Sequence, residues 1–172
     1  MTFSLSTRWI ASRSRSGRDM IEQILALGFD TVELGYDTTV DLVPDVKEMV
    51  GRKVVKVSSL HNFCPVPIGA PHGHPELFPL TSLDSRTRES AVIHTKKTIE
   101  LAAELGAVAI VVHCGNVEMK HLTRDLIDMC EKGQQYSPAY DKIKLKLMMN
   151  RDRKVQNHLD QLYRSLEALL PS

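Results

Sequence analysis

Two histidines each stand at the end of a short apolar run of the kind that forms a β-strand. His61 ends the segment Val55-Lys-Val-Ser-Ser-Leu-His, and His113 ends the segment Val108-Ala-Ile-Val-Val-His. In parallel α/β folds ligands bind at the carboxyl ends of the strands, so both imidazoles are expected to point into one crevice. Neutral imidazole is the commonest metal ligand, and the pair therefore predicts a divalent-metal site for Mn, Mg, Zn or Co. Two ligands do not complete such a site, so we expect the other ligands to come from outside this chain.

Further side chains of ligand type admit two interpretations. Cys64 and Cys114 lie close to the two histidines, which suits thiolate ligands or, alternatively, small residues that line a pocket. His72 and His74 lie in a Pro- and Gly-rich stretch and are expected to be solvated rather than to act as ligands. The remaining histidines are predicted to lie on the surface of helices: His94, His121 and His158.

The elements that must position these residues alternate between strands and helices. Apolar runs predict strands at 3–7, 31–36, 54–60 and 108–112, and helical periodicity predicts helices at 19–27, 45–50 and 84–104. Ser16, Thr38 or Thr39, and Asp84 or Ser85 are the expected N-caps. The last strand is apolar throughout, which predicts a strand covered on both faces. The order and the crossover lengths indicate an α/β fold with about four parallel strands and flanking helices.

The remaining segments are less regular. Residues 65–83 include five of the eight prolines, which is typical of a binding loop or a flexible one. A helix is predicted at 117–132, and a long charged C-terminal helix at 141–170 would span about 45 Å. Its apolar stripe favours packing against the preceding sheet over a coiled-coil pair. We expect one domain over residues 1–172, with a βα core at 1–116 and a helical extension at 117–172.

Composition bounds the class of protein. Apolar content of 42% and charged content of 25% are typical of a soluble globular protein. The formal net charge of +1 does not favour nucleic-acid binding. Three cysteines without CxxC spacing, and apolar runs too short to span a membrane, indicate a reduced, cytoplasmic protein.

Three segments carry a resemblance to a known family. Gly28-Phe-Asp-Thr-Val-Glu-Leu, Ser59-Leu-His-Asn-Phe-Cys-Pro and Val111-Val-His-Cys-Gly resemble the xylose isomerase-like TIM-barrel superfamily. That group includes sugar and sugar-phosphate isomerases and epimerases, and DNA-repair enzymes of the endonuclease IV type. The resemblance covers roughly the first two-thirds of the chain. A complete (β/α)8 barrel has about 250 residues, so the resemblance implies a partial TIM barrel, its N-terminal portion.

The resemblance also implies roles for individual residues. His61 and His113 match histidines that bind metal or line the sugar site, and Glu33 matches a glutamate near the barrel mouth. The family's other metal-binding residues come from later strands and begin with a Glu-Asn motif, which does not follow Leu170. The chain is therefore expected to be a fragment, or half of a site that another subunit completes.

The function implied by the resemblance is a metal-dependent isomerase or epimerase acting on a sugar or sugar phosphate. A divalent ion would chelate sugar oxygens while a carboxylate removes a carbon-bound proton to form an enediolate. Glu33 would position the histidines or substrate, or act as the base; the alternative is a strand-end glutamate paired with a cation. Asn62 and Asn116 suit substrate hydrogen bonds or turns. Trp9 suits an apolar wall for a sugar or a core position.

Two other functions remain open. An endonuclease IV-like zinc phosphodiesterase acting on abasic DNA would need a basic surface, for which Arg8, Arg13, Arg15 and Arg18 are candidates. A non-catalytic half-barrel that assembles or regulates would have to protect its open strand edges. The long C-terminal helix would then cover one edge or mediate a homodimer.

Overall fold

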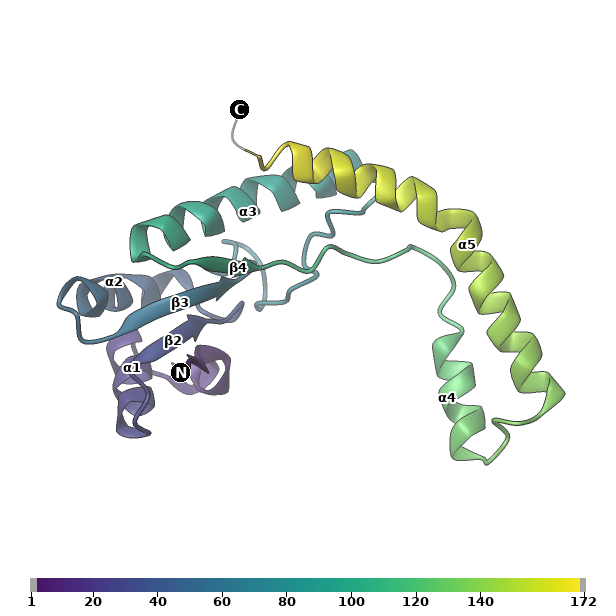
Figure 1. Ribbon diagram of the computed structural model, residues 1–172, viewed down its shortest axis with the longest axis horizontal. Coiled ribbons are helices and arrows are strands. Elements are labelled where there is room, and N and C mark those ends of the chain that lie inside the picture. Colours follow the sequence, from purple (N-terminus) through teal and green to yellow (C-terminus); the bar gives the residue numbers. More distant parts are fainter. Residues whose placement is uncertain (1–2, 171–172) are drawn as a thin grey trace.

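The computed structural model describes residues 3–170, in which strands and helices alternate as far as a fourth strand (Figure 1). The strands are β1 (Leu5–Ser6), β2 (Thr31–Leu34), β3 (Lys56–His61) and β4 (Ala109–Val111). The helices are α1 (Gly17–Ala26), α2 (Val43–Gly51), α3 (Ser85–Leu105), α4 (Thr123–Glu131) and α5 (Pro138–Glu167). All four strands are parallel in the order β1-β2-β3-β4. This arrangement confirms the predicted α/β fold with four parallel strands and a long C-terminal helix.

Capping side chains explain where two of the helices begin. Ser16 Oγ accepts a hydrogen bond from the Asp19 N–H at 3.1 Å before α1, and Asp84 accepts one from the Thr87 N–H at 2.8 Å before α3. Each bond satisfies a backbone N–H that has no partner within its helix. Both caps were predicted from the sequence and are confirmed.

The predicted threonine cap of the second helix is wrong. A 3-10 turn, η3 (Val40–Leu42), precedes α2, and Thr39 at the start of this turn makes no capping hydrogen bond. Thr38 is buried instead. Tight contact with α1 positions this region, because a Cβ at Gly17 would lie 2.1 Å from the carbonyl oxygen of Leu42.

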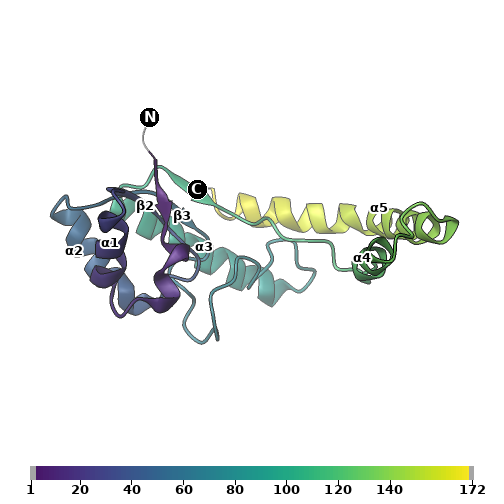
Figure 2. The same ribbon diagram turned by 90° about the horizontal axis from the view of Figure 1, so that it is seen from below.

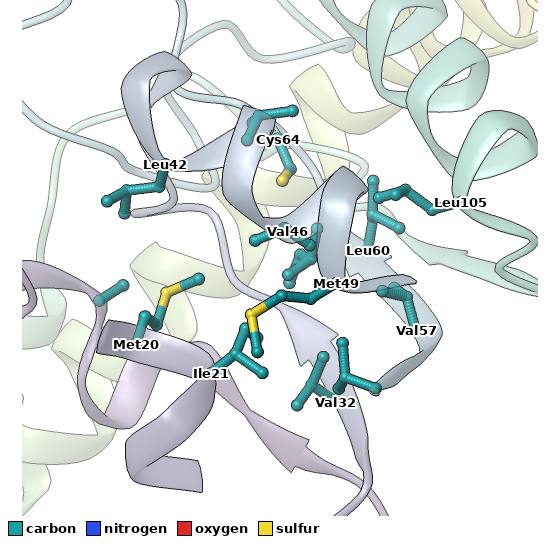
Figure 3. Packing of buried hydrophobic residues seen from close by; sticks show 14 of the residues in the cluster. Met20, Ile21, Val32, Leu42, Val46, Met49, Val57, Leu60, Cys64 and Leu105 are labelled. Atoms are coloured by element: carbon teal, nitrogen blue, oxygen red, sulfur yellow. The ribbon is translucent and has the colours of Figure 1, made fainter. Parts of the chain in front are cut away.

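The hydrophobic core lies between the sheet and the helices that flank it. Figure 3 shows apolar side chains from α1, α2, β2 and β3 meeting in this layer. Fully buried side chains of this kind contribute about 1.5–3 kcal/mol each. The buried members include Met20, Ile21, Ile24, Val32, Leu34, Val46, Met49, Val57 and Leu60.

Polar, partly exposed side chains lie between the core residues of β2 and β3. Ser59 Oγ donates a hydrogen bond to Glu33 Oε2 at 3.0 Å, and Ser58 Oγ donates one to Ser4 Oγ at 2.8 Å. The helices therefore cover the apolar side chains of the sheet, and the polar ones keep contact with solvent.

The fourth strand differs from the expectation of cover on both faces. Val108, just before β4, is 91% exposed, and Val111 within it is 39% exposed. Within residues 3–170, β4 pairs with β3 alone, so its other edge has no neighbouring strand, although Ile110 packs against the hydrophobic core. An open edge of this kind is a site for pairing with another strand.

The C-terminal helix packs on α3 and a loop rather than on the sheet, contrary to the prediction. In its second half, Leu162, Leu166 and Leu169 pack against a small cluster that contains Phe63 and Leu80. The first half of α5 leaves the α/β core and runs beside α4 (Figures 1 and 2). Among residues 3–170, no helix is both long enough and apolar enough to cross a membrane.

His158 was predicted to lie on the surface, but it is 2% exposed. Its Nε2 accepts a hydrogen bond from the Glu118 N–H at 3.1 Å. The proton therefore resides on Nδ1, which donates to the Thr81 carbonyl oxygen at 2.8 Å. Both partners come from loops remote from α5 in the sequence, so local helical periodicity could not reveal this burial.

Candidate active site at the strand ends

The ends of β2 and β3 and the connection after β4 bring three side chains of catalytic type together. His61 is the last residue of β3 and pairs with Val111, two residues before His113. The ring centroids of His61 and His113 are 5.1 Å apart, at an interplanar angle of 38°. His61 Nδ1 lies 4.0 Å from Glu33 Oε1, on the neighbouring strand. His61 and His113, which the strand-end pattern selected, therefore lie beside Glu33, which the family resemblance implied.

His61 is partly buried and has an unused polar atom. Its side chain is 18% exposed, and loss of hydration lowers its pKa below the ordinary value, although the nearby carboxylate of Glu33 opposes this. The charges of His113 and Arg8 lower the pKa of His61 further. Within residues 3–170, its Nε2 is buried and has no hydrogen-bond partner. The site therefore contains a neutral imidazole with a buried nitrogen that has no hydrogen-bond partner among the described residues.

Three neighbouring residues were missed as a group by sequence reasoning. The Arg8 guanidinium lies 4.2 Å from the centroid of the Tyr36 ring and 3.8 Å from Asp37 Oδ2. The Tyr36 ring meets His61 edge-on, with centroids 5.0 Å apart. Asp37 Oδ1 is buried without a partner in the described part of the chain. Tyr36 and Asp37 follow β2 closely, so the strand-end rule that selected His61 also identifies them.

The Pro-rich segment 65–83 passes directly over this end of the sheet. A Cβ at Gly73 would lie 1.9 Å from the carbonyl oxygen of Tyr36. The segment is therefore packed against the backbone that carries the site, which agrees with the binding-loop interpretation. His74 is exposed and accepts a hydrogen bond from a backbone N–H of its own turn.

The strand-end residues do not by themselves form a metal site. Among residues 3–170, no group of three or more His, Cys, Asp or Glu side chains is placed to hold a metal ion. Glu33 already accepts a hydrogen bond from Ser59. Cys64 is buried in the core, and burial raises the pKa of its thiol to about 12, so the thiolate interpretation fails for this residue. A divalent ion at this place would therefore need further ligands from outside residues 3–170.

Asn62 was predicted to bind substrate, but its side chain is turned toward α3. It is 1% exposed. Its Nδ2 donates to Thr95 Oγ1 at 2.9 Å, and its Oδ1 accepts from Thr98 Oγ1 at 2.9 Å. These bonds favour a role in holding the connection after β3 in place.

The structure leaves the substrate roles of Asn116 and Trp9 as predictions. Asn116 is exposed, its backbone is bonded to Thr81, and it lines a cavity of about 510 Å³ between the segment after β4 and α5. Trp9 is 49% exposed, with the Arg13 guanidinium 5.9 Å from its ring centroid. The alternative of a core position is therefore wrong for Trp9.

Comparisons with known proteins agree with the α/β fold described above. The family described as xylose isomerase-like TIM barrel matches residues 21–169. The chain is similar to a crystal structure of a D-tagatose 3-epimerase-like protein, with a TM-score of 0.59 and 19% identity over 98% of this chain and 47% of that chain. It is also similar to the apo crystal structure of 3-keto-D-glucoside 4-epimerase, YcjR, from E. coli, with a TM-score of 0.61 and 15% identity over 98% of this chain and 50% of that chain.

At these identities the likeness concerns the fold. The chain spans about half the length of the two solved structures. No curated protein matches its sequence closely.

Proposed function

This chain belongs to the xylose isomerase-like TIM-barrel family, and from that premise we propose that it supplies the N-terminal half of a sugar or sugar-phosphate isomerase or epimerase site. The observation that carries the proposal is the unpartnered Nε2 of His61, buried beside Glu33 and His113. A sugar hydroxyl suits this atom, because a hydroxyl can both donate and accept a hydrogen bond.

The proposed chemistry is proton transfer next to a carbonyl group. Glu33, whose side chain is 23% exposed, would take the carbon-bound proton as its carboxylate. The electron pair then moves onto the carbonyl oxygen and gives an enediolate. Return of the proton to the adjacent carbon, with transfer of the hydroxyl proton to the former carbonyl oxygen, completes isomerisation. Epimerisation would need a second acid on the opposite face of the same carbon, supplied from outside residues 3–170. His61 and His113 would hold the sugar oxygens during both transfers.

Binding and exchange experiments test this proposal separately. The chain is titrated with ketoses and ketose phosphates while the imidazole signals are followed by NMR, and deuterium uptake from D₂O at the sugar carbon is measured. We expect the His61 signals to shift, His61→Asn to weaken binding at least about tenfold, and Glu33→Gln to bind but not to exchange. His121→Asn is the matched control, since His121 is exposed and lies beyond the strand-end group. Unchanged His61 signals at saturating sugar would refute the proposal.

As the alternative role of the two imidazoles, we propose that His61 and His113 are two ligands of a divalent ion, the cofactor of the complete site, which would then hold the sugar oxygens in their place. The remaining ligands would come from outside residues 3–170, from a further segment or from another subunit. Titration with Mn²⁺ tests this directly, because a bound paramagnetic ion broadens nearby imidazole signals. Broadening that is absent from His61→Ala and His113→Ala supports shared ligation, and broadening that both variants retain opposes it.

The alternative of an abasic-DNA phosphodiesterase gains no specific support. The N-terminal arginines contact different neighbours: Arg8 contacts Tyr36, and Arg18 pairs with Glu48 at 2.8 Å. Incubation with abasic-site DNA belongs in the same assay series, and cleavage there would favour this alternative.

We further propose a single domain over residues 1–172 in the cytoplasm, where Cys64, Cys114 and Cys130 would remain reduced, consistent with their free thiols.

A further inference from the structure

A cavity of about 510 Å³ lies between α5 and the connection that follows β4 (Figure 1). Cys114 lines this cavity and directly follows His113 of the candidate active site. The cavity therefore begins where the group of Glu33, His61 and His113 ends. Its volume lies within the range of about 300–1,000 Å³ that is usual for sites that bind small molecules.

The wall of the cavity carries a positive charge and no negative one. Arg151 of α5 lines the cavity, and no Asp or Glu does. Glu118 belongs to the same connection, but its Oε1 accepts a hydrogen bond from Ser82 Oγ at 3.2 Å, and neither of these residues lines the cavity. The charges of the wall therefore favour an anionic group.

Arg151 has no anionic partner in the described part of the chain. Its side chain is exposed, and among residues 3–170 it forms no ion pair. On a helix, ion pairs form between residues three or four positions apart, and none of those neighbours of Arg151 is acidic. They are Leu147, Met148, Lys154 and Val155. The planar guanidinium therefore keeps its N–H donors for another anion, and phosphate is the anion that arginine binds most often through two parallel hydrogen bonds besides carboxylate.

Two further side chains with hydrogen-bond donors line the cavity, Asn116 and His121, and both are exposed. The backbone of Asn116 is held on both sides of its peptide unit by Thr81 Oγ1, which donates to the carbonyl oxygen at 2.8 Å and accepts from the N–H at 3.0 Å. The segment that carries Asn116 is therefore fixed in place. Three donor groups match the three terminal oxygens of a phosphate ester better than the two oxygens of a carboxylate.

We propose that this cavity binds the phosphate group of a sugar phosphate, with Arg151 as its principal contact. This inference rests on the proposed function and makes it more specific, because it selects phosphorylated sugars over unphosphorylated ones. In a ketose with a terminal phosphate, the carbonyl group and the phosphate lie toward opposite ends of the carbon chain. The carbonyl end would lie at His61 and Glu33, and the phosphate would lie beyond His113, in the cavity.

Inorganic phosphate tests the cavity without the sugar chemistry. The 172-residue chain is titrated with phosphate while the imidazole signal of His121 is followed by NMR. We expect this signal to shift in the wild type, and Arg151→Met to weaken phosphate binding at least about tenfold. Arg153→Met is the matched control, since Arg153 is an exposed arginine of α5 that does not line the cavity. Circular dichroism checks that both variants stay helical. An unshifted His121 signal, or an equal effect of the two substitutions, would overturn the proposal.

Paired sugars then test the selection of substrate. Each ketose is compared with its own terminal phosphate ester, for example fructose with fructose 6-phosphate, by the shift of the His61 signals. We expect the ester to bind at least about tenfold more tightly, and Arg151→Met to remove this difference while it leaves binding of the unphosphorylated ketose unchanged. For unphosphorylated ketoses His121→Asn remains a control, because those sugars have no phosphate to place in the cavity. Equal affinities for ketose and ester would refute this inference and leave the proposed function standing, whereas His61 signals that neither sugar moves would refute the proposed function itself.

Discussion

Asn62→Ala is predicted to destabilise the fold by about 3 kcal/mol. The substitution removes hydrogen bonds to Thr95 and Thr98, both 2.9 Å long and buried. Two such bonds contribute about 1 kcal/mol each, and a buried hydroxyl left without its partner costs about 1 kcal/mol more. Urea denaturation followed by circular dichroism measures this loss as a lower midpoint at a constant slope. The melting temperature should fall by about 6–12 °C.

The matched control is Asn116→Ala, because that asparagine is exposed and its hydrogen bonds to Thr81 are made by its backbone. It should change the unfolding free energy by less than about 0.5 kcal/mol. A double-mutant cycle of Asn62→Ala with Thr95→Val should give a coupling of about 1 kcal/mol. If Asn62→Ala keeps the stability of the wild type and loses only sugar binding, Asn62 contacts substrate and the structural role is wrong.

Three further outcomes follow from the structure. The unfolding free energy should fall as the pH drops below about 6.5, because the lowered pKa of His61 leaves the folded chain with fewer bound protons than the unfolded chain. His61→Asn should make the unfolding free energy less dependent on pH, and an unchanged slope in this variant would contradict the prediction. Iodoacetamide should modify two of the three cysteines in the native chain and spare the buried Cys64, whose pKa is raised to about 12. Three modifications detected by mass spectrometry would mean that the core opens and would contradict the prediction. Gly73→Ala should shift the NMR signals of Tyr36 and lower the unfolding free energy by about 1–3 kcal/mol, because the new Cβ meets a backbone oxygen. Gly51→Ala is the control, since a Cβ there has open space and should not destabilise the chain.

The parallel sheet and the strand-end group could be predicted because both depend on local patterns. Apolar runs separated by capped helices specify parallel strands, and the carboxyl ends of parallel strands meet on one edge. The sequence therefore placed His61 and His113 near each other without any knowledge of their contacts. The same rule would have added Tyr36, had it been applied to every strand and not only to those that end in histidine.

The errors concern residues whose surroundings come from distant segments. His158 is predicted to lie on the surface of a polar helix, yet the loops at Thr81 and Glu118 enclose it. Asn62 is predicted to form a turn or to bind substrate, yet α3 supplies both of its hydrogen-bond partners. β4 has the composition of a buried strand, but a strand's cover depends on its neighbours, which its own residues do not specify.

The segment that follows β4 links the candidate site to α4, and its hydrogen bonds determine how the two can influence each other. Asn116 is fixed through its backbone to Thr81, and Glu118 is fixed through its N–H to His158. A Cβ at Gly115 would lie 2.2 Å from Thr81 Oγ1, so this contact is too close for any other residue. The chain is thus held between His113 and α4, and movement of α4 would have to break these bonds before it displaced the imidazole. These bonds therefore keep the geometry of the strand ends independent of α4 and of the first half of α5.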